Sequence, residues 1–183
     1  MNFKLTRIEG NRTATKGMLT VPTTNFAAYT LEAQDPEYAR IRTKSLLALP
    51  DGIYRLKLFY GKTGYSLRFS MSGAYHLARF EEGNEPADVA SGSIILGVGF
   101  DGESCIKGSK DTMKMFGNFL ELLLSQQRFG KKNEDITLTI QHAPDYVYND
   151  ITEQVEDAFD VGADSWNVIA DNPNVEPSKN DSL

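Results

Sequence analysis

The sequence is poor in the side chains that form disulfides or bind zinc. Its 183 residues include one cysteine, Cys105, and two histidines, His76 and His142. A single cysteine excludes an intrachain disulfide framework. Zinc sites usually combine several Cys and His ligands, so we expect no zinc site, although carboxylate sites for harder cations stay open on this ground alone.

Long apolar segments are also missing. No run of about 18 apolar residues occurs, and the first residues, Met1–Leu5, lack the apolar core of a signal peptide. We therefore expect no membrane span, and we expect synthesis in the cytoplasm without a signal peptide.

Charge is distributed unevenly along the chain. Residues 1–144 contain 18 Lys and Arg against 15 Asp and Glu, a net charge of +3, whereas residues 145–183 contain 1 against 10, a net charge of −9. A weakly positive body gives little reason to expect a nucleic-acid partner. The change in charge predicts a body over residues 1–144 and an acidic C-terminal arm over residues 145–183.

The acidic arm nevertheless contains apolar residues, several of them at helical spacing. Such an acidic composition is typical of disorder, but apolar anchors at this spacing favour a segment that binds another surface. We expect the arm to contact other protein subunits, including copies of the same chain. The predicted contact residues are Ile151, Val155, Phe159, Trp166 and Ile169.

The body reads as short strands with one helix. Apolar residues alternate over 53–60 and 65–71, which predicts a hairpin, and shorter strands are predicted at 76–80 and 136–141. Helical spacing instead predicts one long helix over about 109–128. The expected fold class is mainly β (α+β), a curled antiparallel sheet or small barrel with that helix and a C-terminal extension.

A loop over residues 80–97 connects two of the apolar runs and is rich in residues that build turns. Loops held by a β scaffold often carry sites. The residues expected to shape this loop are Gly83, Asn84, Asp88, Gly92 and Gly97. Its carboxylates lack the regular spacing of a calcium loop, so we expect neither a metal ion nor a cofactor here.

Five segments in order resemble a small domain family of unknown function that is common in phages and in bacterial genomes with phage-like genes. The family pattern centres on I-H-x-G-N-x-P-x-D-T-x-G-C-I-x-x-G, which corresponds here to residues 80–97. The other four segments are Thr30-Leu31-Glu32, Leu49–Tyr54, the helix start Ser109-Lys110, and Ile136–Gln141. This resemblance covers about residues 17–141 and implies a phage virion component.

The His and Gly-Cys-Ile of that pattern are similar to those of L,D-transpeptidases, in which a histidine-activated thiolate attacks a peptidoglycan stem peptide. The present chain has Glu81 at the histidine position and Ser93 at the cysteine position. A carboxylate of ordinary pKa is too weak a base to activate a hydroxyl, so the simpler interpretation is that catalysis has been lost.

The sequence therefore favours a non-enzymatic structural or assembly protein on a degenerate L,D-transpeptidase-like scaffold. Two alternatives stay open. One is a peptidoglycan-processing acyl-transfer enzyme that uses Ser93 or Cys105 with His76 or Glu81, and the other is a cell-wall binding module.

Overall fold

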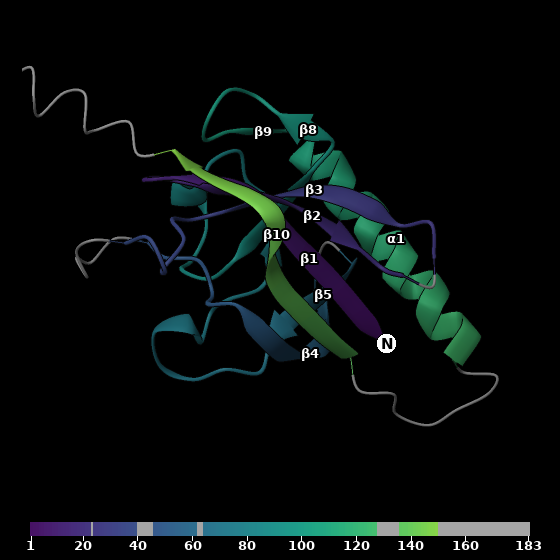
Figure 1. Cartoon of the computed structure of the whole chain (residues 1–183). Coiled ribbons are helices and arrows are strands. Elements are labelled where there is room, and N and C mark those ends of the chain that lie inside the picture. The colour runs from purple at the N-terminus through teal and green to yellow at the C-terminus, as the bar shows by residue number, and fades with distance from the viewer. Residues whose placement is uncertain (23, 40–45, 62–63, 128–135, 150–183) are drawn as a thin grey trace, which may run out of the picture. The chain divides into compact units, whose positions relative to one another are not determined.

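The computed structural model describes residues 1–22, 24–39, 46–61, 64–127 and 136–149 (Figure 1). Contacts divide the chain into two units, Met1–Asn149 and Asp150–Leu183. The second unit lies outside the described residues, and with it lie all the predicted contact residues of the arm: Ile151, Val155, Phe159, Trp166 and Ile169.

Eight strands form one sheet in the order β5-β4-β10-β1-β2-β3-β7-β6. Their bounds are β1 (Asn2–Asn11), β2 (Thr15–Thr20), β3 (Ala27–Glu32), β4 (Gly52–Gly61), β5 (Gly64–Phe69), β6 (Phe80–Glu81), β7 (Ile94–Gly97) and β10 (Ile136–Asn149). Most neighbours are antiparallel, as expected, but the pairs β1/β10 and β6/β7 are parallel. The sheet is therefore mixed.

The two edge strands of the sheet, β5 and β6, approach each other. Arg68 and Arg79 form an isolated antiparallel bridge there, and the Phe69 amide donates to the Ala78 carbonyl at 3.2 Å. The sheet is thus curled and nearly closed. The predicted fold class, mainly β with a curled sheet and one long helix, is confirmed.

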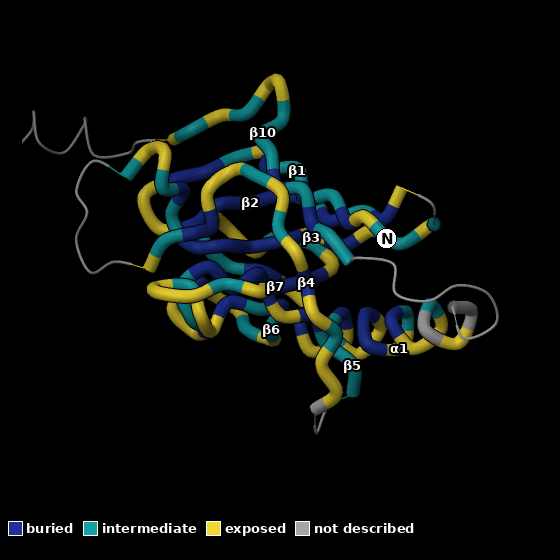
Figure 2. Tube along the Cα trace, turned by 90° about the horizontal axis from the view of Figure 1, so that it is seen from below, coloured by how far each residue is buried: buried dark blue, intermediate teal, exposed yellow. Residues whose placement is uncertain are grey.

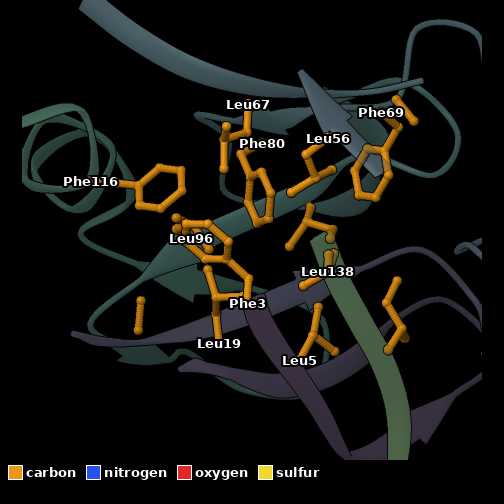
Figure 3. Close-up of a cluster of buried hydrophobic side chains, with 14 of the residues drawn as sticks. Phe3, Leu5, Leu19, Leu56, Leu67, Phe69, Phe80, Leu96, Phe116 and Leu138 are labelled. Atoms are coloured by element: carbon orange, nitrogen blue, oxygen red, sulfur yellow. The ribbon is translucent and has the colours of Figure 1, made fainter. Parts of the chain in front are cut away.

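One helix, α1 (Ser109–Gln127), packs against the curled sheet, close to the predicted range of 109–128. Its Phe116 ring is fully buried, with its centroid 6.0 Å from that of Phe3 in β1 and 5.2 Å from that of Phe80 in β6 (Figure 3). Buried and exposed residues alternate along the helix (Figure 2). Its apolar stripe therefore completes the core. No described helix is long and apolar enough to span a membrane.

The main core fills the inside of the curled sheet, because alternate side chains of each strand point inward. It includes Phe3, Leu5, Leu19, Leu56, Leu67, Phe69, Phe80, Leu96, Phe116 and Leu138 (Figure 3). A smaller cluster of Ala14, Leu31, Val89, Ile95 and Ile106 lies beside the short hairpin of β8 (Gly99–Phe100) and β9 (Ile106–Lys107). Residues on both faces of β3 and β7 are thus buried.

Two local expectations have different outcomes. The hairpin over 53–60 and 65–71 is confirmed by the antiparallel pairing of β4 with β5. The strand expected over 76–80 is wrong for its first part, because a short 3-10 helix, η1 (Gly73–Tyr75), precedes a turn at His76 and Leu77, and β6 begins only at Phe80.

The last strand continues past the expected end of the body at residue 144. Val147, Tyr148 and Asn149 of β10 pair with Glu9, Gly10 and Asn11 of β1, after a register shift in β1 between Arg7 and Glu9. Residues 145–149 therefore belong to the sheet.

Candidate functional site

The loop between β6 and β7 is shaped by hydrogen bonds within its own backbone. The Asp88 carboxylate accepts from the backbone amides of Asn84 at 2.7 Å and Glu85 at 3.0 Å, and these bonds lower the pKa of Asp88. A short 3-10 helix, η2 (Pro86–Asp88), follows from this turn. The Asp88 carboxylate thus joins the two ends of the turn from Asn84 to Asp88.

Two glycines of the loop, Gly92 and Gly97, lie where neighbouring atoms leave no room for a side chain. Gly92 has a φ of +78°, and an added Cβ would lie 2.6 Å from the Tyr75 ring. At Gly97 an added Cβ would lie 2.5 Å from the Lys107 carbonyl oxygen. Gly83 donates its amide to the Ser109 hydroxyl at 3.1 Å, which joins the loop to the start of α1. These positions hold the loop against the sheet and the helix.

The two ends of the loop bring Glu81 and Ser93 together. The parallel strands β6 and β7 pair Phe80 with Ile94 and Glu81 with Ile95, so Ser93, two residues before Ile95, lies diagonally across from Glu81 on the same face. The Ser93 hydroxyl donates to Glu81 Oε1 at 2.8 Å. The positions that correspond to the histidine and cysteine of the family pattern are therefore in direct contact.

Arg79 occupies the rest of the Glu81 carboxylate. Its Nε lies 2.9 Å from Glu81 Oε1 and its Nη2 donates to Oε2 at 3.0 Å, while the Arg79 amide donates to the Ser93 hydroxyl at 3.3 Å. We call these three residues the Arg79–Glu81–Ser93 network. Both oxygens of the Glu81 carboxylate are therefore occupied by the Arg79 guanidinium, and one of them also accepts from Ser93.

Access to Ser93 is also restricted, since Ser93 is only 1% exposed. A nucleophile for acyl transfer needs a base that can take its proton and an open path for the substrate. The geometry of this network supplies neither of these.

The remaining sequence candidates lie apart from this network. His76 is exposed at the end of η1, and its Nδ1 lies 2.8 Å from the Gly73 carbonyl oxygen. Cys105 is a half-buried free thiol just before β9. Within the described residues, neither side chain hydrogen-bonds to Ser93.

A second group of polar residues, which the sequence did not single out, lies at one end of the sheet interior. We call Arg7, Glu32, Asp35, Asp51 and His142 the ionic cluster. Arg7 and Glu32 are completely buried, and the guanidinium binds Glu32 through Nε at 3.0 Å and Nη2 at 2.8 Å. Arg7 Nη1 also donates to Asp51 Oδ1 at 3.0 Å.

The carboxylates of the ionic cluster compensate the buried positive charge of Arg7. Burial acts to lower the pKa of Arg7, but the attraction of Glu32, Asp35 and Asp51 outweighs burial and raises that pKa above its usual value. A buried arginine of this kind stays charged and fixes the carboxylates around it.

His142 in β10 links two of these carboxylates. Its Nε2 lies 2.5 Å from Asp35 Oδ2 and its Nδ1 lies 2.8 Å from Asp51 Oδ2. Each of the two ring nitrogens therefore has a carboxylate oxygen as its hydrogen-bond partner. The ring then offers no free nitrogen to act as a base.

Tyr146 completes the cluster on the same strand. Its hydroxyl donates to Asp35 Oδ2 at 3.2 Å, and burial followed by the Asp35 charge raises its pKa. Two neighbouring tyrosines, Tyr38 and Tyr148, stack with ring centroids 4.5 Å apart. The strand segment after His142 is thus held by both polar and aromatic contacts.

One signal in the sequence pointed to this cluster. Phe3, Leu5 and Arg7 share one face of an alternating strand, and an arginine on a core face needs buried carboxylates as partners. The partners themselves could not be found from spacing, since His142 is 107 residues from Asp35 and 91 from Asp51.

Among the described residues, no group of three or more His, Cys, Asp or Glu side chains is arranged to hold a metal ion. Comparison with protein-family models, curated proteins and solved structures gives no match for this chain. The residues and their geometry therefore carry the functional argument.

Proposed function

We propose that this chain is a non-enzymatic structural or assembly protein, of the kind found in phage virions, whose body keeps an L,D-transpeptidase-like scaffold without its chemistry. The observation that carries this proposal is the Arg79–Glu81–Ser93 network. Its serine is buried and its carboxylate is bound by a guanidinium on both oxygens.

The alternative enzyme would need a base from elsewhere in the body. His142 is occupied by Asp35 and Asp51 on its two nitrogens, and His76 lies in an exposed turn without a hydrogen bond to Ser93 or Cys105. Removing a serine proton near neutral pH requires a positioned base. The described residues bring no free base to either candidate nucleophile.

The assembly role rests on the resemblance to a phage-associated family and on the acidic arm. Residues 150–183 contain 9 Asp and Glu against 1 Lys, a net charge of −8, together with the apolar residues predicted to form contacts. A segment with both features favours a protein surface as its partner. We propose that this segment contacts a neighbouring subunit.

Catalysis is tested with purified peptidoglycan and synthetic tetrapeptide stems. We expect mass spectrometry to find neither new cross-links nor an acyl-enzyme on Ser93 or Cys105. Ser125→Ala, a change of an exposed helix residue, is the control for Ser93→Ala. Turnover that disappears in Ser93→Ala or Cys105→Ala but persists in Ser125→Ala would establish the enzyme instead, and binding to sacculi without turnover would indicate a cell-wall module.

Assembly is tested by deleting residues 150–183 rather than 145–183, because residues 145–149 belong to β10. We expect the shortened chain to keep its circular dichroism spectrum and to sediment as a monomer, while the full chain self-associates. Self-association that survives the deletion would remove the arm from the proposed function.

A further inference from the structure

The outer face of β5, β4, β10 and β1 gathers basic side chains. Arg68 of β5, Arg55 and Lys57 of β4, and Lys4 of β1 occupy outward positions that alternate with core residues. The outward residues of β10 between them, Thr137 and Thr139, are uncharged. We call this surface the basic face.

The cations of the basic face have no acidic partners in the part of the body that the structure describes. Among the described residues, no Asp or Glu forms an ion pair with Lys4, Arg55, Lys57 or Arg68. Lys57 and Arg68 lie directly opposite each other on paired strands. Like charges in that position destabilise a sheet, so an acidic partner would relieve the repulsion.

A groove lies at the same end of the face. It has a volume of about 580 Å³ and is lined by Lys57, Phe59, Arg68 and Met71, among other residues of β4, β5 and the segment after β5. The Arg68 guanidinium carbon lies 3.5 Å from the centre of the Phe59 ring, which is 38% exposed. The groove therefore combines fixed positive charge with apolar surface, as an acidic segment with apolar anchors requires.

Residues 150–183 match this surface in both respects, with a net charge of −8 and the apolar residues Ile151, Val155, Phe159, Trp166 and Ile169. The described chain ends at Asn149, the last residue of β10 (Figure 1). The groove lies near the other end of this strand, because Leu56 of β4 pairs with Ile136, the first residue of β10. The paired part of β1 beside β10 runs over nine residue steps, from Asn2 to Asn11, so the two ends of β10 lie about 30 Å apart.

We propose that residues 150–183 of a second copy of this chain dock on the basic face and its groove. This inference rests on the proposed assembly function and names the surface that receives the arm. Because the arm and the basic face are different surfaces, each contact joins unlike parts of two copies, so reciprocal exchange of arms closes a dimer and successive exchange generates rings or filaments.

The first test reverses charge on the basic face with Lys57→Glu/Arg68→Glu. We expect sedimentation velocity to show self-association weakened by about tenfold or more. The matched control is Lys110→Glu/Lys114→Glu, which makes the same charge change at exposed positions of α1. Self-association of the wild type should also fall at about 1 M salt, where the Debye length is about 3 Å. Thermal melting of each variant shows that it is folded, and Lys57→Gln/Arg68→Gln replaces the reversal if it is not.

The second test distinguishes a neighbour's arm from the chain's own. One full-length variant carries the reversed face, and another carries a neutralised arm, Glu153→Gln/Glu156→Gln/Asp157→Asn/Asp160→Asn. Each should be monomeric alone, and the mixture should form a 1:1 complex, because one intact arm meets one intact face. Trp166 is the only tryptophan of the chain, so its emission reports whether the arm has moved to a new environment.

Several results would overturn the inference. If the two variants form no complex on mixing, and the Lys57→Glu/Arg68→Glu change alters Trp166 emission at every dilution, the arm binds its own body. A face that binds short duplex DNA while the mixture stays monomeric would make a nucleic acid the occupant. If deletion of residues 150–183 abolishes self-association but the reversed face does not, the inference fails while the proposed assembly function stands.

Discussion

At the scale of single residues, the completely buried Arg7 is the most consequential polar side chain of the body. It binds the completely buried Glu32 through two nitrogens and also reaches Asp51. Removing one partner of a buried ion pair leaves the other charge without compensation, which usually costs about 3–5 kcal/mol. The folded state therefore depends on this arginine more than on any surface ion pair.

We expect Arg7→Met to lower the free energy of unfolding by about 3–5 kcal/mol, because it leaves Glu32 buried without its cation. Urea denaturation measures the loss. Lys4→Met makes the same change at an outward position of the same strand and should stay within about 0.5 kcal/mol of the wild type. Equal losses in the two variants would show that Arg7 acts only through strand propensity.

The Arg79–Glu81–Ser93 network shows what a residue-level resemblance can and cannot predict. The family pattern assigned Glu81 and Ser93 to its histidine and cysteine positions, and in the structure the Ser93 hydroxyl lies 2.8 Å from Glu81 Oε1. Arg79 was not predicted, because nothing in its spacing distinguishes an arginine that binds Glu81 from one on a solvated strand. Its role follows only from the parallel pairing of β6 with β7.

At the scale of elements, sequence patterns predicted the helix and the hairpin, which form between residues close together in the chain. Alternating apolar residues identified the β4–β5 hairpin, and helical spacing identified α1 nearly to its ends. The parallel pairing of β10 with β1 was not predicted, since it joins residues about 135 positions apart and no turn sets its register. The ionic cluster was missed for the same reason, because β10 carries His142 to its partners.

The second half of β10 makes the body sensitive to alkaline pH. Burial, and then the Asp35 charge, raises the pKa of Tyr146. Above the ordinary tyrosine pKa of about 10, the unfolded chain loses the phenolic proton while the folded chain keeps it. The unfolded state then binds fewer protons, so the free energy of unfolding falls as pH rises.

We expect the wild-type free energy of unfolding to decline above about pH 10, and the decline to be shallower in Tyr146→Phe. Denaturant titrations at a series of pH values measure both slopes. Tyr38 and Tyr54, whose pKa values are also raised, leave part of the slope in the variant. Tyr60→Phe is the control, since Tyr60 is 70% exposed, and a variant slope equal to wild type would exclude Tyr146 as the cause.

At the scale of the whole molecule, the boundary between body and arm lies where the strand pairing of β10 ends and not where the net charge changes. The change in charge suggested an end of the body at residue 144, whereas the sheet continues to Asn149. Charge could not reveal this, because Tyr146, Val147 and Tyr148 are held by pairing with β1 and by aromatic contacts from Tyr38. The acidic composition begins before the sheet ends.

The two boundaries predict different behaviour for two shortened chains. A chain that ends at Asn149 keeps the Tyr38–Tyr148 stack, the Tyr146–Asp35 hydrogen bond and the bond from Asn149 to Glu9 at 3.0 Å. A chain that ends at Pro144 loses all three, along with the last pairs between β10 and β1. We expect the shorter chain to be less stable by about 2–4 kcal/mol, the scale of losing large side chains from packed positions.

Urea denaturation of both shortened chains beside the full chain measures this difference. The chain that ends at Asn149 should match the full chain in midpoint and slope under dilute conditions, because both cores lie within residues 1–149. If both shortened chains unfold at the same urea concentration, the end of β10 contributes nothing to the body. If the longer one is also destabilised, residues 150–183 stabilise the body, and their role extends beyond contact with a neighbour.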